Sequence, residues 1–370
     1  MRDVDRPLHP FTVLTTDRIT MTRRPARLVR SALTAVAVVT AATLTLTGCA
    51  GEGSGTSTAA AAGGAGGNAK TLNIDFATYN PLSLVIKQKG WLEDALKKQG
   101  VSVNWVQSAG SNKANEALRS GAIDVGSTAG SAALLARANG SPIRTVDIYS
   151  QPEWSALVTT KDSGITSVAD LKGKSVAATK GTDPYFFLLQ SLAANGLKAS
   201  DITVQNLQHA DGRTALQNGS VQACAGLDPI MAAAENDGAT LFSRNVGFNT
   251  YGFLNARESF LQEKPEIAQT VINTYEAARA WAKAHPAETA GILADVAGID
   301  KAVATKVIGR TNLGVDPAPG AKQRAVLEKV GRIIVDSGDV KDAATVTTAL
   351  DALLDDDLVA KAEPSAVATK

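Results

Sequence analysis

The chain has 370 residues, of which 44% are hydrophobic and 20% charged, and its formal net charge is +1. This balance argues against nucleic acid as a partner, because no basic excess is available to neutralise phosphates. The length is sufficient for two lobes that each bury a core.

Residues 1–48 have the order of a secretory signal. Arg23, Arg24, Arg27 and Arg30 form a basic segment, and the apolar run that follows, 31–46, is short for a membrane span of about 20 residues. We therefore expect a signal peptide over 1–48. We also expect Met21 to be the true start, which would make 1–20 a mis-assigned beginning.

The signal ends in Leu46-Thr47-Gly48-Cys49, which resembles a bacterial lipobox and implies cleavage before Cys49 and lipid on its thiol. A chance cysteine after an ordinary signal is the alternative. Residues 49–70 are rich in glycine and alanine without apolar periodicity, so they predict a flexible tether with a reach of about 25 Å. Export to the outer face of the cell membrane follows from this order. Cys224, the other cysteine, is expected to be a small buried apolar residue.

Beyond the tether, strand-like and helix-like segments alternate. Strands are expected at 71–77, 101–107, 122–125, 145–150, 155–160, 174–179, 202–207 and 238–242. From Pro265 onward the chain is expected to be mostly helical, with Pro265 and Pro286 each at a first helical position. The alternation predicts an α/β protein whose lobes each contain a mostly parallel sheet flanked by helices.

A faint internal repeat has an offset of 98 residues. Residues 117–125 match 215–223, and in both copies a helix is expected to end at a glycine before a short strand and a small-residue loop. Two related lobes with equivalent loops are one interpretation, and chance similarity is the other.

Several loops follow a predicted strand and precede a predicted helix. They are Tyr79-Asn80-Pro81, Ser108-Ala109-Gly110, Ser127-Thr128-Ala129-Gly130, Lys180-Gly181-Thr182-Asp183-Pro184 and Leu227-Asp228-Pro229. Helix N-termini carry free N–H donors and a partial positive charge that suit an anionic group, and glycine allows close approach. Because ligands of open α/β sheets lie at the carboxyl ends of the strands, we expect these loops to line a cleft. The alternative is that their side chains only cap their own helices.

The residues expected to bind the ligand are Tyr79, Asn80, Ser108, Gly110, Ser127, Thr128, Gly130, Gly181, Thr182, Asp183, Tyr185, Leu227 and Asp228. Asp183 is either a plain helix cap or a ligand contact that favours a cationic or hydrogen-bond-donating group. Tyr185 or Phe186 could form an apolar wall of the pocket, whereas Trp154 could lie at its rim or in the core.

Catalytic signals are weak in this sequence. After the signal, His209 and His285 are the histidines, expected in a loop and at a solvated helix end. Neither paired-histidine metal spacing nor a phosphate-binding loop motif is found, so we expect no enzyme, no cofactor and no metal. A Ser/His/Asp site that uses His209 and a Schiff base on Lys180 are the catalytic alternatives.

Five stretches resemble the aliphatic-sulfonate, taurine and nitrate binding proteins of ABC transporters, which have the type II periplasmic-binding-protein fold. They are "KQKGWLE" (87–93), "EALRSGAIDVGST" (116–128), "SVADLKGKSVAATKGT" (167–182), "LLQSLAANGLKASDI" (188–202) and "LDP" (227–229). The likeness runs in order from 71 to about 358.

The resemblance implies two lobes that close on a small solute, with lobe one formed by 71–152 plus 250–370 and lobe two by 153–249. It also implies a monomer that delivers the solute to an ABC permease and ATPase. The contact positions that it carries over are Asn80, Ser108, Ser127, Thr128, Thr182 and Asp228.

Two positions depart from the sulfonate binders, which have tryptophan at Leu227 and a small hydroxyl residue at Asp183. Because of these departures, a larger, apolar or amine-bearing ligand is an alternative to a sulfonate. The expected function is a lipid-anchored solute-binding protein of an ABC importer. The alternatives are an enzyme of the same fold that acts on a small heterocyclic or ester substrate, and a ligand-sensing receptor that does not deliver.

Overall fold

A computed structural model describes residues 70–369 of the chain. The predicted signal peptide, Cys49 and residues 49–69 of the tether lie outside the described residues. Lys70, the last residue of the predicted tether, is instead the first residue of strand β1.

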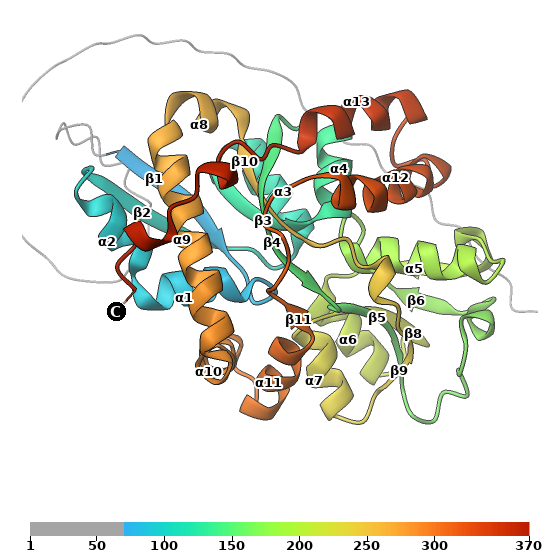
Figure 1. Cartoon of the computed structure of the whole chain (residues 1–370). Helices are drawn as coiled ribbons and strands as arrows, with labels where there is room; N and C mark the ends of the chain where they lie inside the picture. Colours follow the sequence, from blue (N-terminus) through green and yellow to red (C-terminus); the bar gives the residue numbers. More distant parts are fainter. Residues whose placement is uncertain (1–69, 370) are drawn as a thin grey trace, which may run out of the picture. The chain divides into compact units, whose positions relative to one another are not determined.

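Strands and helices alternate through the first two thirds of the described chain, and helices dominate the rest (Figure 1). The strands are β1 (Lys70–Phe76), β2 (Val101–Gln107), β3 (Val125–Ala129), β4 (Ile143–Pro152), β5 (Ser155–Thr159), β6 (Ser175–Ala177), β7 (Thr203–Gln205), β8 (Ala223–Leu227), β9 (Thr240–Ser243), β10 (Gly252–Arg257) and β11 (Thr311–Asn312).

Most of the α-helices follow a loop, but two begin directly after a strand. The α-helices are α1 (Pro81–Lys89), α2 (Trp91–Lys97), α3 (Ser111–Ser120), α4 (Gly130–Ala138), α5 (Asp183–Ala194), α6 (His209–Gln217), α7 (Ile230–Asn236), α8 (Glu258–Glu263), α9 (Pro265–Ala284), α10 (Pro286–Ala297), α11 (Lys301–Gly309), α12 (Ala321–Asp336) and α13 (Ala343–Leu353). Pro265 and Pro286 are the first residues of α9 and α10, as expected. Within residues 70–369, none of the helices combines the length and the apolar character that crossing a membrane requires.

The strands form a six-stranded sheet in the order β11-β4-β10-β3-β1-β2 and a five-stranded sheet in the order β7-β6-β8-β5-β9. Pairing is parallel for β1 with β2 and β3, and for β6 with β7 and β8. The pairs that involve β5, β10 or β11 are antiparallel. The predicted α/β class is confirmed, and the sheets are mixed.

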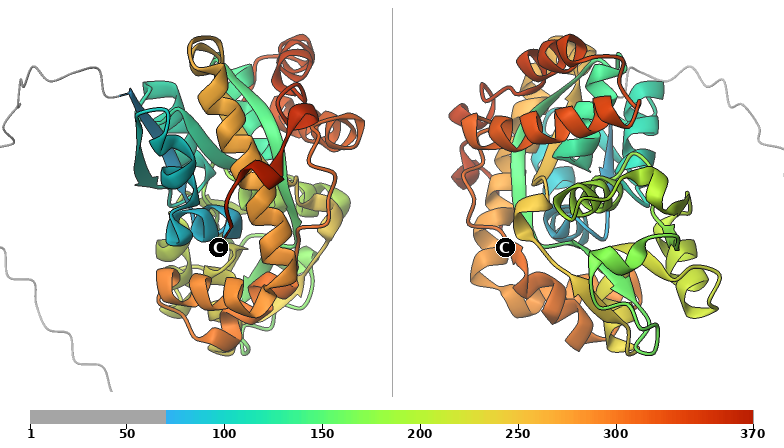
Figure 2. Two further views of the ribbon diagram at one scale, coloured as in Figure 1. Left: turned by 60° about the vertical axis from the view of Figure 1, so that its left-hand side comes forward. Right: turned by 90° about the vertical axis from the view of Figure 1, so that its right-hand side faces the viewer.

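The mixed pairing has a topological cause. β4 leads directly into β5, and β9 leads into β10 through 244–251, so the chain passes from one sheet to the other without an intervening α-helix (Figure 2). A parallel neighbour requires a long crossover connection, usually a helix, whereas a strand that arrives from the other sheet can pair antiparallel. The resemblance placed the lobe boundaries at 152/153 and 249/250, close to these two passages, but the alternation of strands and helices did not predict the antiparallel pairs of β5 and β10.

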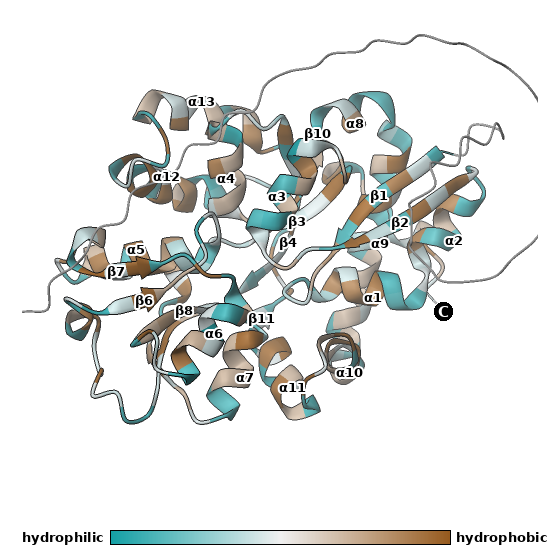
Figure 3. Cartoon of the chain, turned by 180° about the vertical axis from the view of Figure 1, so that it is seen from behind, coloured by the Kyte–Doolittle hydropathy of each residue, from teal (hydrophilic) through white to brown (hydrophobic). Residues whose placement is uncertain are grey.

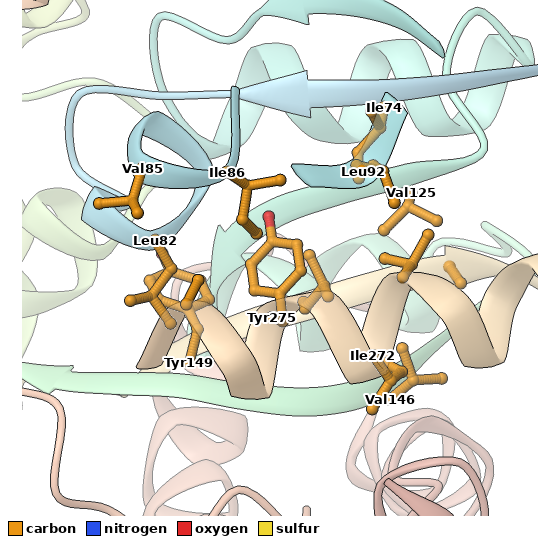
Figure 4. Close-up of a cluster of buried hydrophobic side chains, with 14 of the residues drawn as sticks. Ile74, Leu82, Val85, Ile86, Leu92, Val125, Val146, Tyr149, Ile272 and Tyr275 are labelled. Atoms are coloured by element: carbon orange, nitrogen blue, oxygen red, sulfur yellow. The ribbon is translucent and has the colours of Figure 1, made fainter. Parts of the chain in front are cut away.

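Alternating side chains of the six-stranded sheet bury two different faces. Leu254 of β10 packs in a core with β1, α1, α2 and α9, whereas its neighbour Phe253 packs with α3, α4, α12 and α13. Figure 4 shows part of the first core, where Tyr275 of α9 and Tyr149 of β4 lie among aliphatic side chains such as Leu82 and Ile86 of α1.

The five-stranded sheet alternates in the same way. Leu157 of β5 packs toward α5, whereas Ala156 and Val158 pack with α6 and α7 around Met231. Cys224 belongs to this second cluster and is buried as a free thiol, as predicted. The core that contains α5 also contains α12 and α13, so one hydrophobic cluster spans helices of both sheets.

A smaller cluster also joins elements of both sheets. Ala232 of α7 packs with Leu293 of α10 and Val303 of α11, and hydrophobic parts of these helices lie near one another in Figure 3. The two sheets are therefore bridged by apolar packing at more than one place.

The internal repeat coincides with equivalent strands. β3 covers 125–129 and β8 covers 223–227, which is the same offset of 98 residues, and every residue of both strands is buried. Each has a parallel neighbour on one side and an antiparallel neighbour on the other. The expected strand at 122–125 is wrong, because the strand begins at Val125 and places Ser127 and Thr128 inside the sheet.

Candidate functional site

Asp75 connects β1 to β3 and to the loop that follows β2, its two neighbours in the sheet. Its Oδ1 accepts hydrogen bonds from the backbone N–H and the hydroxyl of Ser127, at 2.9 and 3.0 Å, and the Ser108 hydroxyl also bonds to the carboxyl. The side chain is completely buried. Burial raises the pKa of Asp75 to about 7, although the serine hydrogen bonds act in the opposite direction.

Tyr79 and Asn80 lie beside this carboxyl, and both are buried. The Tyr79 hydroxyl donates to the carbonyl of Ser127 at 2.9 Å, and its ring meets the Trp154 ring edge-on at 5.9 Å. Asn80 is the N-cap of α1, since its Oδ1 accepts from the Ser83 N–H. The capping interpretation therefore describes Asn80 in this structure.

The Thr128 hydroxyl is also occupied by the protein. Its Oγ1 accepts from Nδ2 of Asn255 at 2.7 Å and donates to the carbonyl of Ala129 at 2.9 Å. Thr182 is the N-cap residue of α5, and its hydroxyl donates to the carbonyl of Thr179 at 2.6 Å. These hydroxyls stabilise the loops on which they lie.

Asp183 connects both passages between the sheets to α4 and α5. Its carboxylate accepts from the Ser131 hydroxyl at 2.7 Å, from Nε1 of Trp154 at 2.8 Å, and from the N–H and hydroxyl of Thr250 at 3.0 and 2.5 Å. Burial raises the pKa of Asp183, and the four hydrogen bonds oppose that rise. The sequence predicted Asp183 to be either a plain helix cap or a ligand contact. In the structure its carboxylate oxygens instead accept hydrogen bonds from Ser131, Trp154 and Thr250.

Gly130 shows how closely the second passage approaches α4. A Cβ at this position would lie 2.4 Å from the carbonyl oxygen of Thr250 and 2.9 Å from the Phe253 ring. Tyr251, next in the chain, has a φ of 65°, which side chains other than glycine rarely adopt. The predicted ligand residue Gly130 is therefore required by backbone packing.

Asp228 forms a second link between elements of the two sheets. It follows β8, and Arg310, which precedes β11, donates to its carboxylate through Nε and Nη2 at 2.5 and 2.7 Å. Burial raises the pKa of Asp228 to about 6, whereas Arg310 lowers it. The predicted contact residue Asp228 is thus held by an arginine of the same chain.

The N-termini of three helices meet where the two sheets face each other. A Cβ at Gly110, the N-cap of α3, would lie 3.1 Å from Nε2 of His209, the first residue of α6. A Cβ at Gly181, which precedes α5, would lie 3.8 Å from Cβ of Asn112. The N-caps of α3, α5 and α6 make no side-chain hydrogen bond to the helix end. We refer to this place, formed by Gly110–Asn112, Gly181–Thr182 and Gln208–His209, as the helix junction.

Of the predicted ligand residues, Gly110, Gly181 and Thr182 belong to the helix junction, and Tyr185 and Leu227 are among those that do not. Tyr185 lines a surface hollow with Lys180, Leu189 and Ile333 instead of the helix junction. Leu227 packs in the core that also contains Tyr79 and Trp154. Tyr185, the third residue of α5, is only 5% exposed and belongs to the core that contains α5 and α12.

His209, which was considered for catalysis, and the Cys224 thiol are both buried. The expected loop residue His209 is buried at the start of α6, and its Nδ1 lies 3.2 Å from the Thr179 hydroxyl. Burial raises the pKa of the Cys224 thiol to about 12, which makes it a poor nucleophile. No group of three or more histidine, cysteine, aspartate or glutamate side chains suited to a metal ion occurs within residues 70–369.

Comparison with known families identifies the chain. The sequence model of a family described as NMT1/THI5 like matches residues 81–289, which is more than half of the chain. The chain belongs to this NMT1/THI5-like family. The resemblance to aliphatic-sulfonate binding proteins is also confirmed. A Bacillus subtilis protein named as an aliphatic sulfonates-binding protein is 29% identical over 232 residues, which cover 62% of this chain and 70% of that protein.

Solved structures share the fold of this NMT1/THI5-like chain. The alkanesulfonate-binding protein of Xanthomonas axonopodis pv. citri, solved with bound MOPS, is similar with a TM-score of 0.68 and 26% identity, covering 77% of this chain and 99% of that chain. The desulfurization enzyme DSZB has the same fold, with a TM-score of 0.59 and 13% identity, over 79% of this chain and 98% of that chain. The predicted type II periplasmic-binding fold is confirmed.

Asp75, Asn112 and Gln208 were not predicted as site residues from the sequence. Thr71, Asn73 and Asp75 alternate with apolar residues along β1, a pattern that normally marks a solvent-facing side. This side of β1 is covered at the carboxyl end of the strand, so Asp75 is buried, whereas Thr71 near the other end is only partly buried. No periodicity in the sequence distinguishes the two.

Proposed function

We propose that this member of the NMT1/THI5-like family is the solute-binding component of an ABC importer and that its solute is a small organic sulfonate. The observation that carries the proposal is the meeting of the α3, α5 and α6 N-termini at the helix junction. α3 belongs to the connections of the six-stranded sheet, and α5 and α6 belong to those of the five-stranded sheet. A solute bound there would be held from both sides.

The chemistry of the helix junction suits a sulfonate. Each helix N-terminus presents backbone N–H groups without intrahelical partners and a partial positive charge, and these stabilise anionic oxygens. The sulfonate-related names of the relatives support this ligand class. Asp183 does not argue for an amine-bearing solute, because its acceptors are already used by Ser131, Trp154 and Thr250.

The proposal includes two lobes, with lobe one formed by 71–152 plus 250–370 and lobe two by 153–249. In support, the five-stranded sheet takes its strands from 155–243, whereas the strands of the six-stranded sheet come from 70–152 and 252–312. A solute that touches both lobes binds the closed form more tightly than the open form and thereby shifts the equilibrium toward closure. The ABC permease would then receive the solute from the closed form.

We also propose that Cys49 is lipidated and holds the protein at the outer face of the cell membrane. The basic and apolar order of 1–48 and the lipobox-like Leu46-Thr47-Gly48-Cys49 support it. Metabolic labelling with a radioactive fatty acid should label the wild type and leave Cys49→Ala unlabelled. Equal labelling of both proteins would refute the anchor.

Isothermal titration calorimetry of the exported chain tests the main proposal. The probes are ethanesulfonate, MOPS, nitrate, sulfate and a pyrimidine precursor, and each is also incubated with the protein and analysed for turnover. We expect one sulfonate to bind with a 1:1 stoichiometry and to be recovered unchanged. Hydrolysis of an added ester without binding of any sulfonate would instead support an enzyme of this fold.

A further inference from the structure

The His209 imidazole carries an acceptor that the described protein does not use. Nδ1 lies 3.2 Å from the Thr179 hydroxyl, and that hydroxyl donates its one proton to the carbonyl of Leu207 at 2.6 Å. Thr179 therefore accepts from Nδ1, which places the ring proton on Nδ1. Burial lowers the pKa of His209 to about 4, so the ring is neutral at pH 7 and Nε2 has a free lone pair.

This lone pair lies at the helix junction. Nε2 of His209 is 3.1 Å, and Oδ1 of Asn112 is 2.9 Å, from the point where a Cβ of residue 110 would stand. Within residues 70–369, neither atom has a hydrogen-bond partner, and the same holds for Oε1 of Gln208. His209 is only 7% exposed. Buried acceptors are normally paired, so three unpaired ones beside uncapped helix N-termini point to a group that donates to them.

We propose that His209 is a specificity-determining residue whose Nε2 accepts a hydrogen bond from an O–H or N–H group of the solute. The chain would then select sulfonates that carry a hydroxyl or ammonium group over plain alkanesulfonates. This inference rests on the proposed sulfonate-binding function.

The physical basis of the selection is the cost of an unpaired acceptor. An apolar group that fills the same space excludes water from Nε2 without replacing the hydrogen bond, and sites built to bond an O–H or N–H group reject analogues that lack it. The helix N-termini hold the sulfonate, and Nε2 faces the same point as the α3 N-terminus. The donor must therefore be close to the sulfonate, as in a two-carbon solute.

Three solutes of equal heavy-atom skeleton provide the test, because only the terminal group differs. They are propane-1-sulfonate, 2-hydroxyethanesulfonate and 2-aminoethanesulfonate, each titrated calorimetrically into the exported chain. For the wild type we expect at least one donor-bearing solute to bind about tenfold or more tightly than propane-1-sulfonate, since an unpaired buried acceptor costs about 1–3 kcal/mol. The hydroxyl and ammonium arms distinguish the two possible donors.

Two variants assign the preference to His209. His209→Phe removes the acceptor and should reduce the affinity ratio to near one, with propane-1-sulfonate binding retained. His209→Gln keeps an acceptor and should keep part of the preference. His285→Phe, at an exposed helix end, is the matched control and should leave the ratio unchanged.

The possible results distinguish a failure of the role of His209 from a failure of the proposed sulfonate-binding function. Equal binding of all three solutes by the folded wild type would overturn the role of His209 and leave the proposed function standing. A preference that His209→Phe retains would also overturn it. Failure of every sulfonate to bind would overturn the proposed function and this inference together. If His209→Phe does not fold, His209→Gln decides the assignment, because a preference weaker than that of the wild type supports the role of His209 and an undiminished preference overturns it.

Discussion

The carboxylate of Asp183 accepts two hydrogen bonds from Thr250, one from the backbone N–H at 3.0 Å and one from the hydroxyl at 2.5 Å. Asp183 begins α5 beside the five-stranded sheet, whereas Thr250 lies in the passage that returns to the six-stranded sheet. Ser131 and Trp154 complete the set of donors. A buried carboxylate thus fixes the geometry of both passages between the sheets.

Replacement of Asp183 by asparagine should destabilise the protein. The introduced NH₂ group faces donors, and at least one of the four hydrogen bonds is lost, so we expect a decrease of about 2–4 kcal/mol in the free energy of unfolding. Urea denaturation followed by circular dichroism measures it. Asp162→Asn, at an exposed position, is the control and should behave as the wild type. A wild-type midpoint for Asp183→Asn would contradict the role assigned to this carboxylate.

Removal of the Arg310 guanidinium should be costly because Asp228 stays buried without its partner. For Arg310→Met we expect a loss of about 3–5 kcal/mol in the free energy of unfolding. The double variant Asp228→Asn, Arg310→Met removes both charges and should recover part of that loss. Arg324→Met, which breaks an exposed ion pair, serves as the control. If the loss of unfolding free energy in the double variant equalled the sum of the losses in Arg310→Met and Asp228→Asn, the Asp228–Arg310 ion pair would not be the cause.

Asp75 should make stability depend on pH in a defined direction. Its pKa is raised to about 7 in the folded protein, from 3.8 for the unperturbed group, so the folded state holds a proton that the unfolded state releases between these values. Stability from this group is full below about pH 4 and is lost as the pH rises toward 7. Relative to Asp75→Asn, the wild type should lose on the order of 4 kcal/mol between pH 4 and pH 8. Parallel stability curves for the two proteins would contradict the buried position of the carboxyl.

Gly110→Ala tests the contact across the helix junction. The added Cβ would stand 3.1 Å from Nε2 of His209, and because φ is 163° the backbone itself tolerates alanine. We expect sulfonate affinity to fall about tenfold, the equivalent of roughly 1.4 kcal/mol, while the unfolding midpoint changes little. Gly291→Ala lies in α10, where a Cβ meets no atom within 4 Å, and is the matched control. Unchanged affinity in Gly110→Ala would remove the support for solute binding at this place.

The sequence carried enough information for the fold class and the family. Strand-sized apolar runs separated by helical segments predicted the α/β class, and the stretches from 87 to 229 identified the family, because these signals are local. The strand β2 was expected at 101–107 and is found there. The repeat between 117–125 and 215–223 likewise predicted that β3 and β8 are equivalent.

The candidate site was less accessible from the sequence because its contacts are made by residues far apart in the chain. Asp183 bonds Ser131 and Thr250, which are 52 and 67 positions away. An aspartate before a proline has the pattern of a helix cap, and nothing local reveals distant donors. His209 was placed in a loop because it precedes Ala210-Asp211-Gly212-Arg213, and its approach to Gly110 is made by residues far apart in the chain.

A reversible disulfide across the helix junction tests most directly whether the solute binds between the two sheets. A Cβ at Gly181 would lie 3.8 Å from Cβ of Asn112, which matches the usual Cβ separation of a disulfide, and the reduced double variant accounts for the strain that a side chain at a φ of 76° introduces. The double variant Asn112→Cys, Gly181→Cys is prepared with Cys49→Ser, oxidised before solute is added, and titrated with 2-hydroxyethanesulfonate. The account predicts no binding in the oxidised form and recovered binding after reduction with dithiothreitol. Equal affinity in the oxidised and reduced forms would place the solute elsewhere and contradict the account.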